Sequence, residues 1–174
     1  MSHLLLIGFM GAGKSMVGRR VAHVLGMPFI DLDEEIERAS GTSVAEIFAA
    51  EGERTFRAAE SAALASLADV EPAVVACGGG VVVDDENRRI LRELGHVIYL
   101  RVEADEALAR IGDTSGRPLL AHGDAATMAS TLLGARETLY RTTADAVVDT
   151  SGTAPAHVAD EVVAIARSLR EAGA

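Results

Sequence analysis

A glycine-rich stretch close to the N-terminus, Gly8-Phe9-Met10-Gly11-Ala12-Gly13-Lys14-Ser15, constrains this chain more than any other part of it. It follows an apolar run, residues 4–7, and opens a segment whose apolar residues have helical spacing. The glycines let the backbone approach a polyanion without Cβ clashes, and the helix N-terminus adds about half a positive charge. Lys14 can reach the outer phosphates, and the Ser15 hydroxyl can ligate Mg²⁺. The stretch therefore predicts a phosphate-binding loop for ATP or GTP.

Length, composition and charge limit the class of protein that carries this loop. The 174 residues suffice for one domain with a sizeable core, and 49% of them are hydrophobic, without a run long enough to span a membrane. The first residues lead straight into the loop, which argues against a signal peptide, and a single cysteine fits a reducing compartment. The net charge of −10 argues against nucleic acid as a partner. We expect a cytoplasmic enzyme or switch without nucleic-acid or membrane partners.

Two carboxylates follow the second predicted strand, which begins at Phe29. Neighbouring residues of a strand point to opposite faces, so Asp31 and Asp33 are expected on one face, at the C-terminal edge of the sheet. Open α/β sheets bind ligands at that edge, where the two side chains can serve Mg²⁺ and orient an acceptor hydroxyl. The alternative is an acidic helix cap at Asp33, and the two roles are compatible.

Two arginines are candidates for gripping an acceptor anion, because a guanidinium matches a carboxylate with two parallel hydrogen bonds. Arg57 lies on a predicted helix three residues before Glu60 and can pair with it. On its own, this pair is typical of a solvated salt bridge at the surface. Arg136 lies on a later helix, predicted over about 126–141.

Three consecutive glycines, Gly78, Gly79 and Gly80, directly follow the third predicted strand. Such a run is costly in unfolded-chain entropy, and close approach of a ligand to the backbone is one reason for it. A flexible turn is the alternative. Cys77, just before the run, is expected to be a small core residue.

The segment 112–124 is expected to form a lid. Its glycines at 112, 116 and 123 can absorb backbone rotation, and Arg117 precedes a proline that stiffens the chain. A closing lid excludes water, and Arg117 would bring a positive charge to the transferring phosphoryl group.

Five short predicted strands alternate with helices, which indicates parallel β-α-β units with right-handed crossovers. They cover residues 4–7, 29–30, 74–77, 96–100 and 146–149. The phosphate loop, the carboxylates and the triple glycine then share one sheet edge, a combination that phosphoryl transfer needs. A GTP-dependent switch is disfavoured, because the only asparagine, Asn87, is followed by Arg88 and no Asn-Lys-x-Asp motif exists. A non-catalytic nucleotide-binding module remains a remote alternative.

Taken together, these motifs resemble the shikimate kinase family, in family order and spacing over nearly the whole chain. They are the phosphate loop, Asp31-Leu32-Asp33, Phe56-Arg57-Ala58-Ala59-Glu60, Gly78-Gly79-Gly80, Arg117-Pro118-Leu119-Leu120 and Arg136-Glu137-Thr138-Leu139-Tyr140. The resemblance implies one domain over 1–174 with a nucleoside-monophosphate-kinase-like α/β/α fold, a five-stranded parallel sheet of order 2-3-1-4-5, and a monomer. It also implies ATP-dependent phosphorylation of the shikimate 3-hydroxyl, giving shikimate 3-phosphate and ADP on the route to chorismate and aromatic amino acids.

The resemblance further implies a role for each matched residue. The catalytic residues would be Asp33, Lys14 and Arg117. Shikimate would be bound by Asp33, Arg57, Gly79, Gly80 and Arg136. ATP would be bound by Gly11, Ala12, Gly13, Lys14, Ser15, Met16, Arg110, Arg117 and Thr153. Mg²⁺ would be held by Ser15 and, through water, by Asp31.

Two questions stay open at this level. The loop 151–155 carries no arginine beside the expected adenine site, which leaves the preference for ATP over other nucleotides open. A gluconate kinase or a nucleoside-monophosphate kinase would share the fold and the phosphate loop. Only the acceptor-side residues Asp33, Arg57 and Arg136, with the triple glycine, separate the gluconate-type kinase from the shikimate kinase.

Overall fold

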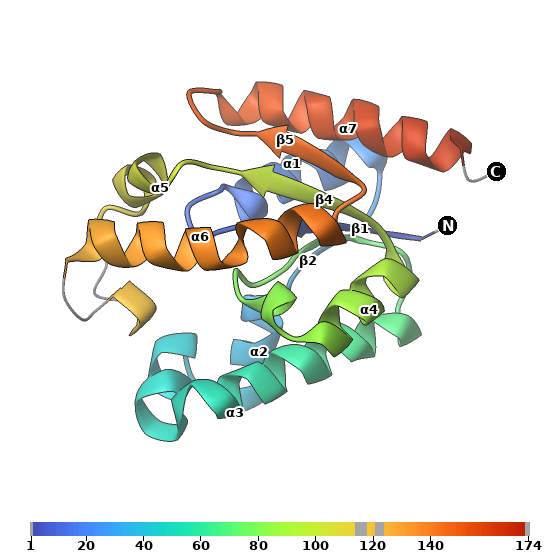
Figure 1. The fold of residues 1–174 in the computed structure, drawn as a ribbon. Coiled ribbons are helices and arrows are strands. Elements are labelled where there is room, and N and C mark those ends of the chain that lie inside the picture. Colours follow the sequence, from blue (N-terminus) through green and yellow to red (C-terminus); the bar gives the residue numbers. More distant parts are fainter. Residues whose placement is uncertain (1, 114–117, 121–123, 173–174) are drawn as a thin grey trace.

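The computed structural model describes residues 2–113, 118–120 and 124–172, and Figure 1 shows its fold. Within these residues, five strands form one parallel sheet in the order β2-β3-β1-β4-β5. The strands are β1 (His3–Ile7), β2 (Phe29–Asp31), β3 (Val74–Ala76), β4 (Gly95–Arg101) and β5 (Ala146–Asp149). The predicted strands and the strand order implied by the resemblance are therefore confirmed.

The strand order places β1 at the centre of the sheet. β1 pairs with β3 on one side and with β4 on the other, with Leu5 opposite both Val75 and Val97. The chain thus builds one half of the sheet before it crosses to the other half at β1. A crevice opens outside the carboxyl end of a strand at such a switch point. The phosphate loop, which follows Ile7, lies there.

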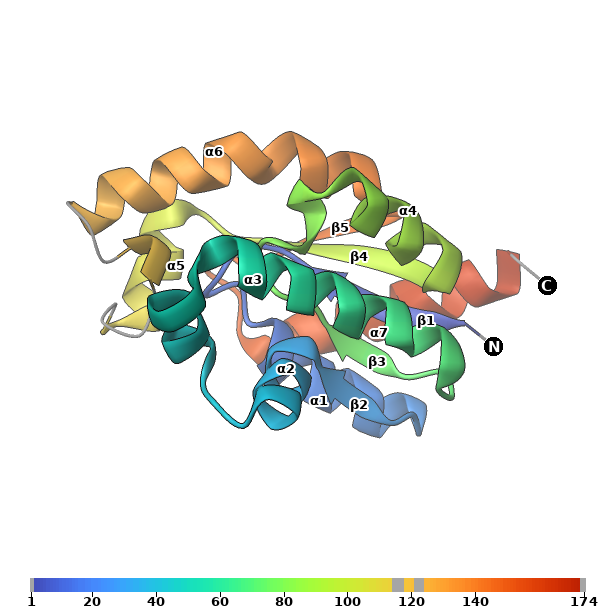
Figure 2. The same ribbon diagram turned by 90° about the horizontal axis from the view of Figure 1, so that it is seen from below.

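Helices cover both faces of the sheet, which gives three layers (Figures 1 and 2). They are α1 (Lys14–Leu25), α2 (Leu32–Ser40), α3 (Val44–Ser66), α4 (Asp85–Leu94), α5 (Ala104–Ile111), α6 (Ala125–Thr143) and α7 (Pro155–Ala172). α1 and α7 pack on one face, whereas α3, α4 and α6 pack on the other. No helix in the described part of the chain is long and apolar enough to cross a bilayer.

The apolar run in β1 is explained by these two layers. Leu4 and Leu6 belong to the core beneath α1 and α7, and Leu5 and Ile7 to the core beneath the other helices. All four side chains are at most 1% exposed. A parallel strand covered on both faces has no solvent side and needs no polar alternation.

The start of α2 corrects one alternative from the sequence. α2 begins at Leu32, and its N-cap is Asp31, whose carboxylate accepts a hydrogen bond from the Asp33 amide at 3.1 Å. Asp33 therefore lies in the first helical turn and is not the cap. The reason is that β2 is only three residues long, so strand alternation ends at Asp31.

The long helix α3 is interrupted at one internal glycine. Gly52 has φ 84° and ψ 170°, which interrupts the helix between two segments. Ser43 and Glu46 form a capping box at the start of α3, and the backbone hydrogen bond from Ser43 is the main cause that lowers the pKa of Glu46 to about 2. A small separate core of Ile36, Ile47 and Phe56 joins α2 to α3.

Candidate active site

The phosphate loop joins β1 to α1 and requires glycine at several positions. Gly8, Gly11 and Gly13 all have positive φ, at 145°, 77° and 88°. A Cβ on Gly11 would lie 2.6 Å from the carbonyl oxygen of Ala107, and one on Gly8 would overlap the carbonyl of Leu100. Positive φ therefore disfavours side chains at all three positions, and close packing against β4 and α5 excludes them at Gly8 and Gly11.

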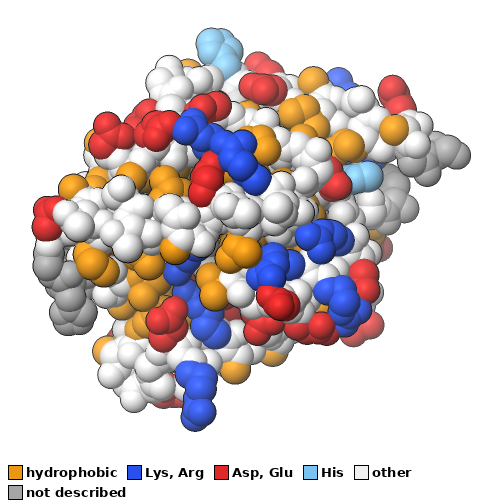
Figure 3. All heavy atoms as spheres, in the orientation of Figure 1, with side chains coloured by type: hydrophobic (Ala, Val, Ile, Leu, Met, Phe, Trp, Pro, Cys, Tyr) orange, Lys and Arg blue, Asp and Glu red, His pale blue; other side chains and the backbone are white. Residues whose placement is uncertain are grey.

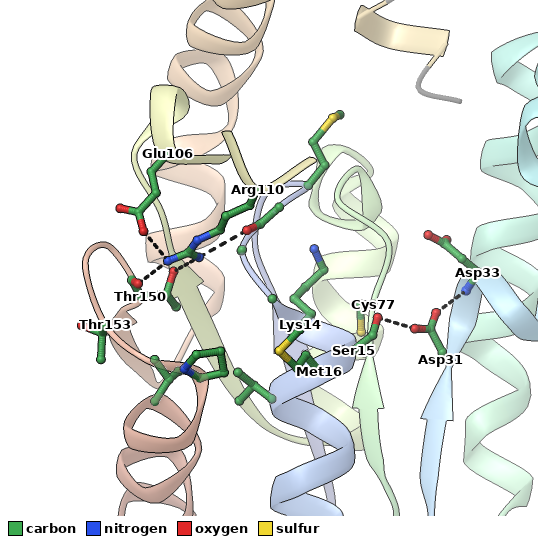
Figure 4. Close-up of a pocket in the computed structure, with 18 of the residues that line it drawn as sticks. Lys14, Ser15, Met16, Asp31, Asp33, Cys77, Glu106, Arg110, Thr150 and Thr153 are labelled. Atoms are coloured by element: carbon green, nitrogen blue, oxygen red, sulfur yellow. Dashed lines mark hydrogen bonds and ion pairs between the residues drawn. The ribbon is translucent and has the colours of Figure 1, made fainter. Parts of the chain in front are cut away.

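Two polar side chains at the start of α1 are held in place beside this loop by hydrogen bonds. The Lys14 ammonium donates to the carbonyl oxygens of Gly8 and Phe9, at 2.8 and 2.9 Å. The Ser15 hydroxyl donates to Asp31 Oδ2 at 2.5 Å. Figure 4 shows Lys14 and Ser15 between the Arg110 side of the cleft and the two aspartates. The sequence-predicted phosphate and metal ligands thus lie together.

Ser15 and Asp31 fit a hard divalent cation. Both offer oxygen, and their side chains are in contact, so an ion could draw on both groups. Mg²⁺ is usually bound in kinases through one or two protein oxygens, with water and substrate phosphates completing its shell. In the described residues no group of three or more His, Cys, Asp or Glu could hold a metal ion. A site of two protein oxygens agrees with a metal that arrives with the nucleotide.

A cleft of about 740 Å³ opens above the phosphate loop. All predicted nucleotide-binding residues that the structure describes line it, namely Gly11, Ala12, Gly13, Lys14, Ser15, Met16, Arg110 and Thr153. Arg117 lies outside the described residues. The cleft is large enough for a small-molecule ligand of nucleotide size.

Arg110 connects two loops that line this cleft, the phosphate loop and the loop after β5 (Figure 4). Its guanidinium, on α5, donates to Gly11 O at 3.3 Å and to the Thr150 hydroxyl at 3.0 Å. Glu106, one helical turn earlier, holds Arg110 at 2.6 Å and also accepts from the Gly152 amide. Arg110 therefore ties the phosphate loop to the loop that follows β5.

A second, smaller cleft of about 80 Å³ lies beside the first. It is lined by all the residues predicted to bind the acceptor: Asp33, Arg57, Gly79, Gly80 and Arg136. Asp33 and Met10 line both clefts. A phosphoryl donor in the large cleft and an acceptor in the small one would meet beside Asp33.

Arg57 is held by a buried carboxylate that the sequence did not identify as a site residue. Its guanidinium contacts Glu60 at 2.8 Å and Glu53 at 3.1 Å. Glu60 is completely buried and Arg57 is 22% exposed, so the pair is not a solvated surface salt bridge. Burial raises the pKa of Glu60, although Arg57 opposes this effect. Two sequence signals pointed to Glu60, its spacing from Arg57 and its place at the end of the family motif 56–60, but neither indicated that it is buried.

Two glycines of the run, Gly78 and Gly80, leave room for side chains that pack against them. A Cβ on Gly78 would overlap the Glu60 carboxylate and lie 3.1 Å from Asp33 Oδ1. A Cβ on Gly80 would overlap the Arg57 guanidinium. The run is therefore more than a flexible turn, because it admits Arg57 and Glu60 to the cleft. Cys77, before the run, is buried in the core as predicted.

The fold and the paired clefts define a small-molecule kinase of the phosphate-loop class. The family model for shikimate kinase matches residues 10–167. The shikimate kinase of Pseudomonas syringae pv. tomato is 43% identical over 164 residues, covering 94% of this chain and 95% of that protein. The chain belongs to the shikimate kinase family.

Solved structures agree with this assignment. A shikimate kinase from Acinetobacter baumannii, solved in complex with shikimate, is 36% identical with a TM-score of 0.93, covering 97% of this chain and 94% of that one. A gluconokinase from Sinorhizobium meliloti is 23% identical with a TM-score of 0.61, covering 98% of this chain and 94% of that one. At that identity the likeness shows the fold alone.

Proposed function

We propose that this chain transfers the γ-phosphoryl group of ATP to the 3-hydroxyl of shikimate, giving shikimate 3-phosphate and ADP. The observation that carries the proposal is the meeting of two clefts at Asp33, with Arg57 and Arg136 in the smaller one. Two guanidinium groups with the Asp33 carboxylate beside them suit an acceptor that has both a carboxylate and a hydroxyl group. The relation to a shikimate kinase solved with shikimate supports the same substrate.

Each group has a defined task in the proposed reaction. Arg57 and Arg136 bind the carboxylate of shikimate and so fix the orientation of its ring. Asp33 accepts the hydrogen of the attacking 3-hydroxyl, either orienting this group or removing its proton. Lys14 turns from the loop carbonyls to the β- and γ-phosphates and stabilises the charge on them. Gly79 and Gly80 complete the acceptor site with backbone groups.

We further propose that the metal is Mg²⁺, held by the Ser15 hydroxyl and, through water, by Asp31. When bound, it would neutralise charge on the β- and γ-phosphates. Arg117 and the lid at 112–124 belong to the same proposal. They rest on the sequence alone, because Arg117 lies outside the described residues.

A coupled ADP-release assay tests the proposed function directly. The protein is assayed with ATP, Mg²⁺ and one acceptor from a panel of shikimate, gluconate and several nucleoside monophosphates. ADP release that depends on shikimate is expected, with little release for the other acceptors. Release with gluconate or a nucleoside monophosphate, but not with shikimate, would replace the proposal with one of the alternatives. The absence of release with every acceptor would favour a non-catalytic nucleotide-binding module.

A further inference from the structure

A pair of buried tyrosines, used by no step of the proposed reaction, lies between the sheet and α6. Tyr99 on β4 and Tyr140 on α6 are each 0% exposed, and their rings stack with centroids 4.9 Å apart. Their hydroxyl groups bind different partners. The Tyr99 hydroxyl donates to Glu137 at 2.6 Å, whereas the Tyr140 hydroxyl donates to the carbonyl oxygen of Gly79. Of the two hydroxyl groups, only that of Tyr140 therefore binds the glycine loop at residues 78–80.

The Gly79 carbonyl is held from α6 by two donors. Besides the Tyr140 hydroxyl, Arg136 donates to it at 3.3 Å. Figure 1 shows α6 running past the segment that joins β3 to α4. On its other side the loop rests against the phosphate loop, because a Cβ on Gly79 would lie 3.4 Å from the Met10 amide nitrogen. The loop is thus fixed between α6 and the phosphate loop.

Holding this carbonyl also sets the direction of an amide. The carbonyl of Gly79 and the N–H of Gly80 belong to one planar trans peptide unit and point in opposite directions. With the carbonyl directed at α6, the Gly80 N–H points away from α6. Both glycines line the smaller cleft, and within the described part of the chain neither amide donates a hydrogen bond. These amides are therefore available to a ligand.

We propose that Tyr140 is a positioning residue for the acceptor: its hydroxyl holds the Gly79 carbonyl and thereby presents the Gly80 amide to the bound acceptor. This inference rests on the proposed function. Burial raises the pKa of Tyr140 to about 12, so its hydroxyl keeps its proton, and remains a donor, throughout the neutral range.

Two matched substitutions separate positioning from packing. Tyr140→Phe keeps the stacked ring and removes only the donor to Gly79, whereas Tyr99→Phe removes the other hydroxyl of the same pair. For Tyr140→Phe the KM for shikimate should rise about five- to tenfold, the effect of one hydrogen bond with Arg136 still in place. The KM for ATP should stay within about twofold of the native value, as should both constants in Tyr99→Phe.

A spectroscopic measurement keeps the inference testable without turnover. With glycine labelled in its carbonyl carbon, the Gly79 resonance should shift in Tyr140→Phe and stay in place in Tyr99→Phe. Thermal unfolding of both variants shows whether either loses packing. An unchanged resonance together with an unchanged KM for shikimate in Tyr140→Phe would overturn the inference. An equal rise in both KM values with a lower unfolding temperature would also overturn it, because the role of Tyr140 would then be structural.

The inference and the proposed function fail in different ways. If the native protein does not phosphorylate shikimate, the proposed function is wrong. The KM comparison is then made with the acceptor that the panel identifies, and the Gly79 resonance still decides whether Tyr140 holds the loop. If shikimate is phosphorylated but Tyr140→Phe matches the native protein, only the inference is wrong.

Discussion

At the scale of single residues, the site depends on charged side chains that are partly or fully buried. Asp33 lines both clefts, while Glu60 is wholly buried behind Arg57. Replacing either carboxylate by its amide removes the charge and leaves the side-chain volume almost unchanged. The effect of the charge can therefore be measured without a large change in packing. The two substitutions have different expected effects: at Asp33 the turnover changes, and at Glu60 the stability of the fold changes.

Replacing Asp33 by Asn should lower turnover by roughly 10²-fold or more, since the amide cannot accept the proton of the acceptor hydroxyl. ATP binding should survive, because the nucleotide cleft keeps its phosphate loop. Steady-state kinetics and nucleotide titration measure the two effects. Asp69→Asn, at an exposed position after α3, provides the matched control. Near-native turnover in Asp33→Asn would show that Asp33 has no part in the chemistry.

The stability of the Glu60→Gln variant, relative to that of the native protein, should increase as the pH rises. In the unfolded chain Glu60 ionises near its ordinary pKa of 4.5, whereas burial raises this pKa in the folded protein. The stability that protonated Glu60 contributes is full below pH 4.5 and is lost as the pH rises through the folded pKa. Each unit of raised pKa corresponds to about 1.4 kcal/mol.

Urea unfolding of the native protein and of Glu60→Gln at a series of pH values from 4 upward measures this difference. Loss of the ionic partner of Arg57 adds an offset, for which Glu53→Gln is the control because Glu53 binds the same arginine from a half-exposed position. A stability difference between native protein and Glu60→Gln that stays constant with pH contradicts the prediction.

The residue types of the site could be predicted from the sequence, but their burial could not. Arg57 and Glu60 have the spacing of any surface pair on a helix, and nothing local shows that Glu60 is enclosed. Its enclosure follows from the packing of α3 against the glycine loop, a contact between distant segments. Tyr140 was missed as a positioning residue for the same reason: its partner, Gly79, lies 61 residues away.

At the scale of elements, glycines serve opposite purposes in two segments. In the loop after β3, Gly78 and Gly80 leave room for Glu60 and Arg57. In α6, Gly134 has open space around its missing side chain and only weakens the helix. Gly78 and Gly80 therefore stabilise the site, whereas Gly134 lowers the stability of α6.

Alanine at these positions should therefore have effects of opposite sign. Gly134→Ala should stabilise the protein by about 0.5–1 kcal/mol, because alanine restricts the unfolded chain and favours the helix. Gly78→Ala should destabilise it by about 1–3 kcal/mol, since the added Cβ overlaps a buried carboxylate that has little room to move. Denaturant unfolding of both variants measures the two changes. Equal effects would show that the contacts of Gly78 are unimportant for stability.

At the scale of the whole molecule, charge and architecture agree with a small-molecule enzyme. On the face shown in Figure 3, acidic and basic side chains are interspersed, without a continuous basic stripe. The strand order could not be obtained from the spacing of the strands, because an alternating pattern fits several sheets. The resemblance supplied it, and the pairing of β1 with both β3 and β4 confirms it. A single domain, a monomeric state and a cytoplasmic location stay predictions.

The lid belongs to this scale, since its closure would join distant parts of the chain. Arg117→Ala should lower turnover by about 10³-fold while acceptor binding is nearly kept, and Arg117→Lys should restore only part of the activity because lysine cannot fork. Hydrogen exchange over 112–124 should slow when nucleotide and acceptor are both bound. Equal exchange in both states, together with full activity of Arg117→Ala, would exclude a lid.

Because Asp33 and Met10 line both clefts, we expect that a single molecule long enough to pass Asp33 would occupy the two at once. A nucleoside polyphosphate joined through a short link to a cyclic hydroxy acid would bind its second half at an effective concentration in the millimolar range. Its avidity would be greatest when the link matches the short span across Asp33. Other phosphate-loop proteins could bind the nucleotide half of such a molecule. Its selectivity for this protein would come from the hydroxy-acid half, which needs Arg57, Arg136 and the triple glycine beside them.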